Sequence, residues 1–154
     1  MKTALFPGSF DPFTLGHESI VKRGLQLFDR VVIAIGVNDQ KMPFFPIEKR
    51  MEQVLACFPN NSRVEVAHYS GLTGDFALQK QCTAILRGVR SVSDYEYEKT
   101  MADFNSGVFG LETLLMFTEP EFSGIQSAIV RELLRHGKDV SAFVPAAIHS
   151  LLNL

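Results

Sequence analysis

The sequence predicts an α/β fold in which a doubly wound, five-stranded parallel sheet carries helices on both faces. Five short apolar segments alternate along the chain with segments of helical periodicity, and this alternation is typical of parallel sheets with right-handed crossovers. One of the five, residues 30–36, is a nearly continuous β-branched run, which indicates a strand covered on both faces. The length of 154 residues, 46% of them hydrophobic, suits one domain, and we treat residues 1–154 as that single domain.

The expected strands are short apolar runs that end at turn residues. The first is expected to stop at Phe6, because Pro7-Gly8 is a strong turn signal. The last contains the aliphatic and aromatic run that ends at Phe117. The five predicted strands are residues 3–6, 30–36, 64–68, 83–88 and 112–117.

The expected helices show apolar residues at a spacing of three and four, or carry helix boundary residues. Gly137 is a plausible C-cap of the fifth helix, and Pro145 suits the first turn of a last, short helix. Phe104 and Phe109 are interpreted as core residues, with a subunit interface as the alternative. The predicted helices are residues 17–27, 47–58, 74–80, 94–109, 127–136 and 145–152.

Composition excludes several classes of protein. A net charge of −2 argues against a general nucleic-acid binder, which would normally be basic. The apolar runs are shorter than the roughly 20 residues of a membrane helix, and the opening residues resemble a strand rather than a signal peptide. We therefore expect no membrane contact and a cytoplasmic protein. Cys57 and Cys82, which are in no metal-binding spacing, are expected to be buried, reduced thiols.

Ligands of doubly wound sheets bind beyond the carboxyl ends of the strands, and the loop at residues 8–17 follows the first strand. Gly8 and Gly16 let the backbone approach a ligand closely, and Ser9 offers a hydroxyl. Thr14 can cap the next helix, whose free N–H groups favour an anion and place His17 beside it. An ordinary turn with a capped helix and a surface histidine remains the alternative.

Two other loops carry cations to the same edge of the sheet. Lys41 follows the second strand; a solvated lysine is the simpler interpretation, although a mobile ammonium suits a reacting phosphate. Arg87 and Arg90 follow the fourth strand, where planar, multi-donor side chains suit phosphate binding. An ion-paired role with the acidic residues 94–98 is the alternative for both arginines.

The loop after the fifth strand, residues 122–128, brings small and polar side chains to a helix N-terminus, which favours an anion. The loop at residues 70–76 carries little signal of its own. His68, His136 and His149 are widely separated and are interpreted as structural or solvated.

The stretch 6–12 (F-P-G-S-F-D-P) followed by Thr14-Leu15-Gly16-His17 resembles the T/H-x-G-H signature of the nucleotidylyltransferase superfamily. Within it the chain resembles the phosphopantetheine adenylyltransferase family in particular, and residues 87–98 are similar to that family's R-G-x-R-x-x-x-D-[FY]-E-Y-E stretch. The resemblance covers about residues 3–145. It implies a Rossmann-like nucleotidylyltransferase fold.

The resemblance also implies a reaction: the adenylyl group of ATP passes to 4′-phosphopantetheine, giving dephospho-CoA and pyrophosphate in coenzyme A biosynthesis. It implies Mg²⁺ bound mainly through the ATP phosphates, with no metal site of the protein's own, and a homohexamer. The catalytic residues it implies are His17, Lys41 and Ser9. The acceptor-binding residues are Ser9, Lys41, Thr73 and Arg87. The ATP-binding residues are Ser9, Phe10, His17, Gly88, Val89, Arg90, Glu98, Phe122, Ser123, Gly124, Ile125, Gln126, Ser127 and Ala128.

The sequence departs from the family pattern in the last of these loops. Phe122 stands where the family has Trp, Gln126 where it has Ser, and Ala128 where it has Ser or Thr, so two hydroxyl donors are missing. Two alternatives stay open. One is another acceptor of the same superfamily (nicotinamide mononucleotide, glycerol phosphate or choline phosphate), and the other is a non-catalytic nucleotide sensor.

Overall fold

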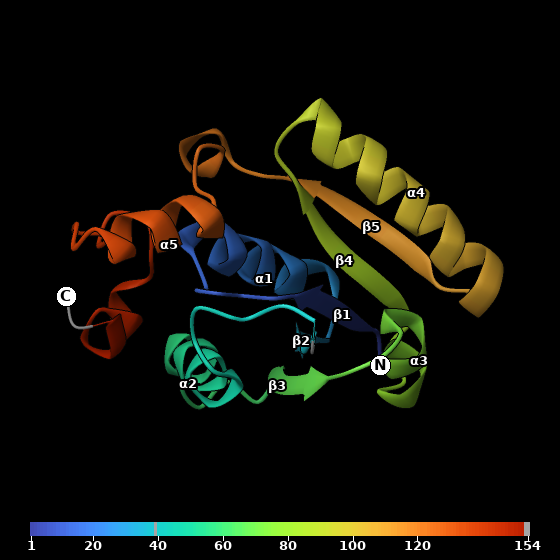
Figure 1. Cartoon of the computed structure of the whole chain (residues 1–154). Coiled ribbons are helices and arrows are strands. Elements are labelled where there is room, and N and C mark those ends of the chain that lie inside the picture. The colour runs from blue at the N-terminus through green and yellow to red at the C-terminus, as the bar shows by residue number, and fades with distance from the viewer. Residues whose placement is uncertain (39, 153–154) are drawn as a thin grey trace.

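The computed structural model, which describes residues 1–38 and 40–152, contains one five-stranded sheet in which every pairing is parallel (Figure 1). The strand order is β3-β2-β1-β4-β5, so the chain reverses its direction of winding beside β1. This confirms the predicted fold class. The strands are β1 (Thr3–Gly8), β2 (Arg30–Gly36), β3 (Val64–Tyr69), β4 (Ala84–Val89) and β5 (Glu112–Phe117).

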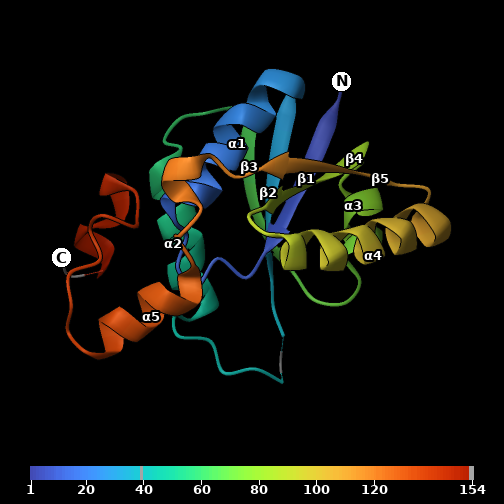
Figure 2. The same ribbon diagram turned by 90° about the horizontal axis from the view of Figure 1, so that it is seen from above.

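Helices cover both faces of the sheet, α1 and α2 on one face and α3 and α4 on the other (Figures 1 and 2). The helix α5 packs outside α2, together with the C-terminal segment. The helices are α1 (Leu15–Leu27), α2 (Ile47–Cys57), α3 (Thr73–Gln79), α4 (Val92–Phe109) and α5 (Ser127–Arg135).

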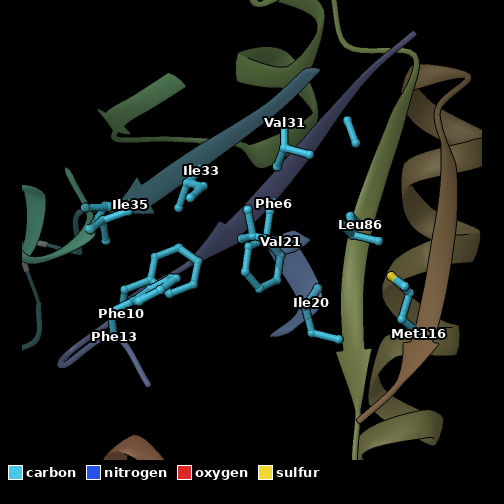
Figure 3. Close-up of a cluster of buried hydrophobic side chains, with 12 residues drawn as sticks. Phe6, Phe10, Phe13, Ile20, Val21, Val31, Ile33, Ile35, Leu86 and Met116 are labelled. Carbon is cyan, nitrogen blue, oxygen red and sulfur yellow. The ribbon is translucent and has the colours of Figure 1, made fainter. Parts of the chain in front are cut away.

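The alternating residues of the central strands build two cores. Phe6, Ile33 and Leu86 face α1 and α2, in the cluster that Figure 3 shows. Leu5 and Val32 face α3 and α4. All five side chains are at most 4% exposed, which is what a sheet covered on both faces requires.

The strand β1 is longer than predicted, because Pro7 and Gly8 continue it rather than end it. Pro7 pairs with Ala34 of β2. Its missing N–H costs no hydrogen bond to β4, because β1 and β4 are no longer paired at Pro7. On that other side, the pairing of β1 with β4 is confined to Ala4 and Leu5. The two central strands therefore separate at their carboxyl ends.

The predicted C-terminal helix 145–152 is wrong as an α-helix. The structure has two short 3₁₀ turns instead, Ala146–Ile148 and Ser150–Leu152. Ile148 and Leu152 are buried in a small core with Val130 of α5, and this packing sets the backbone path. Other helix ends differ from the prediction by at most a few residues.

Phe104 was expected in the core and is instead 42% exposed, whereas Phe109 does pack against the core of the α3 and α4 face. The interpretation of Phe104 was wrong because α4 covers the sheet with few of its side chains; only Glu98 and Asn105 of this helix are buried. Within residues 1–38 and 40–152, no helix combines the length and the hydropathy needed to cross a bilayer.

Candidate active site

A cleft of about 440 Å³ opens where β1 and β4 separate. This is the switch point of the sheet, where doubly wound folds bind their ligands. The loop after β1, the end of β4, the first turns of α4 and the segment leading into α5 line the cleft. The lining residues that were predicted for ATP or acceptor are Ser9, Phe10, His17, Arg87, Gly88, Arg90, Glu98, Phe122, Ile125, Gln126, Ser127 and Ala128.

His17 sits in a reciprocal cap at the start of α1. The Thr14 hydroxyl accepts from the His17 amide, and the Thr14 amide donates to Nδ1 of the His17 ring over 3.1 Å. A nitrogen that accepts a backbone hydrogen bond carries no proton in the neutral ring, so the proton is on Nε2. His17 therefore offers one N–H donor, at Nε2.

Aromatic rings surround His17. Phe10 meets it edge-on at 5.0 Å between ring centroids, and Phe13 lies at 5.4 Å. Burial is the main cause that lowers the pKa of His17 to about 3, and the positive charges of Arg87 and Arg90 contribute to the same decrease. His17 is consequently a neutral hydrogen-bond donor, and not an acid or a cation, throughout the physiological range.

The loop after β1 turns sharply at Phe10, whose φ of 45° lies in the left-handed region. Its ring is 2% exposed and covers Gly8, where a Cβ atom would come within 2.8 Å of the ring. A side chain at Gly8 is therefore incompatible with the loop, which explains the glycine before Ser9.

Both predicted arginines line the cleft, and both are ion-paired as the alternative interpretation expected, while phosphate binding stays a prediction. Arg87 binds Glu98 through two parallel contacts of 2.9 and 2.6 Å, and its third nitrogen donates to the Pro7 carbonyl. Arg90 pairs with Asp94 at 3.1 Å. Arg87 thereby spans the gap between β4 and β1 that the ladder leaves open.

The N-terminus of α5 points into the cleft from the opposite side. Gln126 is the N-cap residue, but its side chain caps no backbone group. Ser127 uses its hydroxyl to donate to the Pro12 carbonyl over 2.9 Å. The hydroxyl thus fixes the loop after β1 against α5, and anion binding by the first backbone N–H groups of α5 stays a prediction.

The lining also includes polar residues to which the sequence analysis gave no binding role. Arg131 lies one helical turn beyond Ser127 on α5 and donates to the Asp11 carbonyl over 2.7 Å; this i, i+4 spacing was the available signal. Tyr97 and Thr118 also line the cleft, and for these two the sequence offered no signal apart from their position beside predicted residues.

Two side cavities adjoin the cleft and share Gly8 and Tyr97 with it. One, of about 130 Å³, lies between the sheet and α4 and is lined by Thr73 and Asn105 among others. The other, of about 660 Å³, lies over the ends of β2 and β3. Thr73, predicted to bind the acceptor, thus shares the smaller side cavity with Arg87, which also lines the cleft.

Four predicted residues line neither the cleft nor its two side cavities. Lys41 is exposed on the loop after β2, and its amide donates to the Asn38 carbonyl. Val89 is buried at 3% exposure, so it offers only backbone groups. Ser123 donates its hydroxyl to the Pro120 carbonyl, and Gly124 is exposed beside it.

The thiols and the remaining histidines are uninvolved. Cys57 and Cys82 are unpaired, and burial raises their pKa values to about 12 and about 11. Cys57 is only partly buried, which modifies the prediction. His136 contacts the carbonyl of Glu132 within its own helix turn. Over residues 1–38 and 40–152 there is no grouping of three His, Cys, Asp or Glu side chains that could hold a metal ion.

Comparison with a family model and with solved structures defines the broad class of protein to which the chain belongs. The cytidylyltransferase-like family model matches residues 5–133, which spans the sheet, the cleft and α5. Two solved structures share the fold. A bifunctional NMN adenylyltransferase/ADP ribose pyrophosphatase from Francisella tularensis has a TM-score of 0.73 at 15% identity, covering 99% of this chain and 48% of that one. A putative nicotinate-nucleotide adenylyltransferase from Vibrio parahaemolyticus has a TM-score of 0.68 at 21% identity over the whole of both chains.

Curated relatives are far more similar in sequence. Phosphopantetheine adenylyltransferase from Phocaeicola vulgatus is 54% identical over 145 residues, covering 94% of this chain and 96% of its own. The protein of the same name from Bacteroides thetaiotaomicron is 50% identical, covering 94% of this chain and 96% of its own. The one from Flavobacterium johnsoniae is 46% identical, covering 96% of this chain and 97% of its own. The chain therefore belongs to the phosphopantetheine adenylyltransferase family.

Proposed function

We propose that the protein transfers the adenylyl group of ATP to 4′-phosphopantetheine, giving dephospho-CoA and pyrophosphate in coenzyme A biosynthesis. The observation that carries the proposal is the convergence of His17, Arg87, Arg90 and the N-terminus of α5 on one cleft. Cationic and N–H donors on all sides of a cavity suit a triphosphate and a second phosphate together. The relatives at about 50% identity support the choice of acceptor.

In this reaction an oxygen of the acceptor phosphate attacks the α-phosphorus of ATP. The new bond joins that oxygen to the α-phosphorus, the bond from the α-phosphorus to the bridging oxygen breaks, and pyrophosphate leaves with the electron pair. The attacking group is already an anion, so no general base is required. Catalysis then depends on positioning and on stabilising charge at the α-phosphate.

His17 suits the second task. Its neutral ring presents a fixed Nε2–H, because the Thr14 amide occupies Nδ1. A preorganised donor of this kind stabilises charge as it develops and loses nothing to reorientation. We assign His17 to the α-phosphate. We assign Ser9, the first residue of the loop after β1, to the attacking phosphate.

The two arginines suit separate phosphates. Arg87 faces both the cleft and the smaller side cavity, so we assign it to the acceptor phosphate, with Thr73 along the rest of the acceptor. Arg90 lies nearer α5, since it donates to the Ile125 carbonyl, and we assign it to ATP together with Gly88, Val89 and Glu98. Residues 122–128 complete the ATP side.

Lys41 enters the proposal through its position. The loop that carries it borders the larger side cavity through Asn38 and Gln40, and its exposed side chain is free to follow phosphate charge. We assign it to the reacting phosphates with Ser9.

We also propose that Mg²⁺ arrives as part of the ATP complex. The two carboxylates that line the cleft, Asp94 and Glu98, are ion-paired with Arg90 and Arg87, so they are not a ligand set available to Mg²⁺. The phosphate oxygens of ATP are such ligands, so the metal belongs to the substrate in this proposal.

A homohexamer in the cytoplasm completes the proposal. Apolar side chains on α4 and β5 are exposed, with Tyr97 at 62%, Val108 at 60% and Phe117 at 78%, and a self-association surface would cover them. The number six rests on the resemblance alone, and sedimentation velocity of the purified protein would measure it.

A substrate panel tests the function. The purified protein is mixed with MgATP and, in turn, 4′-phosphopantetheine, nicotinamide mononucleotide, glycerol phosphate and choline phosphate, and pyrophosphate release is measured. We expect release with 4′-phosphopantetheine alone. Release with another acceptor only would refute the assignment, and ATP binding without any release would favour a nucleotide sensor.

A further inference from the structure

A buried arginine lies beneath the loop that lines the cleft, and no substrate role includes it. Arg50 of α2 is 4% exposed and is not among the residues that line the cleft. No carboxylate of the described residues forms an ion pair with it. Burying an unpaired guanidinium is costly, so the contacts that it does make call for an explanation.

Those contacts join the ends of two strands. One terminal nitrogen, Nη1, donates to the Ser9 carbonyl over 2.8 Å and reaches the Gly36 carbonyl at 3.5 Å. Ser9 follows the last residue of β1, and Gly36 is the last residue of β2. Arg50 therefore holds the Ser9 carbonyl inward, toward α2.

The direction of that carbonyl determines the direction of the next amide. The Ser9–Phe10 peptide is trans, and in a planar trans peptide the C=O and N–H bonds point in opposite directions. Holding the Ser9 carbonyl toward α2 turns the Phe10 amide away from α2. Phe10 lines the cleft, and within residues 1–38 and 40–152 no acceptor receives a hydrogen bond from its amide.

We infer that Arg50 is a positioning residue that orients the Ser9–Phe10 peptide, so that the Phe10 amide is aimed at a phosphate in the cleft. This rests on the proposed function only in that the ligand is a phosphoryl group. The left-handed Phe10 backbone, with φ at 45°, is a conformation that a non-glycine residue adopts only when its surroundings impose it. The Arg50 hydrogen bond supplies that constraint, and its unneutralised charge adds to the attraction for an anion.

The same helix offers a matched control. Gln53 lies one turn beyond Arg50 and is 0% exposed; its amide nitrogen and oxygen have no partner among the described residues. Gln53→Met removes a buried polar group of similar size without touching the loop. Any general effect of altering the buried face of α2 will appear in both Gln53→Met and the Arg50 variants.

The experiment follows the Phe10 amide by ¹⁵N NMR while inorganic pyrophosphate is added to wild type, Arg50→Lys, Arg50→Met and Gln53→Met. Wild type and Gln53→Met are expected to show a downfield shift of the Phe10 proton. Arg50→Lys, which keeps the charge but ends one bond short of the position of Nη1, should show less than half of it. Arg50→Met is expected to lose at least 10-fold in kcat with ATP, with the acceptor KM within 3-fold of wild type.

A Phe10 shift of equal size in wild type and Arg50→Lys would overturn the inference, as would wild-type kcat in a folded Arg50→Met. If Arg50→Met does not fold, the comparison with Arg50→Lys decides. If the acceptor were a different phosphate, the pyrophosphate titration would give the same result, so the two proposals fail separately.

Discussion

The Thr14 amide donates to Nδ1 of His17 across 3.1 Å, while the Thr14 hydroxyl accepts from the His17 amide. One residue thus caps α1 and also selects the tautomer of the ring that faces the cleft. Since the cap is part of the fold, the donor at Nε2 is in place before any ligand arrives.

Removing this donor is expected to abolish most activity and leave the fold intact. In His17→Asn the side-chain oxygen can still accept the Thr14 amide, but no N–H reaches the position of Nε2. We expect kcat to fall about 10²–10³-fold, with ATP binding by calorimetry changed much less. Turnover near that of wild type would remove His17 from the mechanism.

The low pKa of His17 makes stability depend on pH. The folded state holds the ring neutral down to a pKa of about 3, against 6.5 in a free histidine, so the unfolded state binds more protons between these values. This contribution to the free energy of unfolding is fully present above pH 6.5. It is lost as the pH falls toward 3, by at most about 1.4 kcal/mol per pH unit.

Urea unfolding between pH 4 and 7 measures this term. The difference in stability between wild type and His17→Asn should grow in favour of wild type as the pH rises through that window. A difference that does not vary with pH would show that His17 is not held neutral.

Gly8→Ala should disrupt the loop from within. The added Cβ would lie 2.8 Å from the Phe10 ring, which is fixed among other aromatic rings, so we expect a loss of about 1–3 kcal/mol. Gly107→Ala is the control, since nothing lies within 4 Å of its added Cβ and helical alanine is favoured by up to about 1 kcal/mol. Urea denaturation of both variants measures the contrast, and equal stabilities would contradict it.

Gln126→Ser should add the cap that α5 lacks. Gln126 occupies the N-cap without a side-chain hydrogen bond, whereas serine typically stabilises that position by about 1 kcal/mol. We expect a higher free energy of unfolding and a lower KM for ATP, because the better-ordered first turn of α5 and the added hydroxyl both line the cleft at this position. Gln126→Ala should give neither change, and it separates capping from the mere loss of the longer side chain.

Arg87→Met should destabilise the protein through its partner. The carboxylate of Glu98 is 7% exposed, and without Arg87 it would be a buried, unpaired charge, at a cost of about 2–5 kcal/mol. Arg87→Met with Glu98→Gln should recover much of the stability and none of the activity. Thermal unfolding of the single and double variants tests this; an additive double variant would show that the pair is not coupled.

The sequence was most informative where a pattern is local. The parallel sheet followed from the alternation of strands and helices, and the β-branched run of β2 predicted its double burial. Thr14, Gly16 and His17 were interpretable because a cap and a helix start are short-range features. The sequence failed where distant packing decides the outcome, as in the 3₁₀ turns around Ile148 and the exposed ring of Phe104.

Parts of the site lay beyond the reach of sequence reasoning for the same reason. Arg50 and Ser9 are 41 residues apart, and only the packing of α2 under the β1 edge brings them together. The hydrogen bond from the Ser127 hydroxyl to the Pro12 carbonyl, 115 residues away in the sequence, was not predicted. Pairings at such separations follow from the tertiary fold and leave no mark in local spacing.

The early end of the pairing between β1 and β4 has a mechanical consequence. Beyond Leu5 and Ile85 the backbone no longer joins the two halves of the sheet, and at that edge the join is made by the side chain of Arg87 to Pro7. A ligand that binds the carboxyl ends of both strands would hold the two halves of the sheet together at this edge. Nucleotide should therefore slow the exchange of backbone amide hydrogens in β1 and in β4 together.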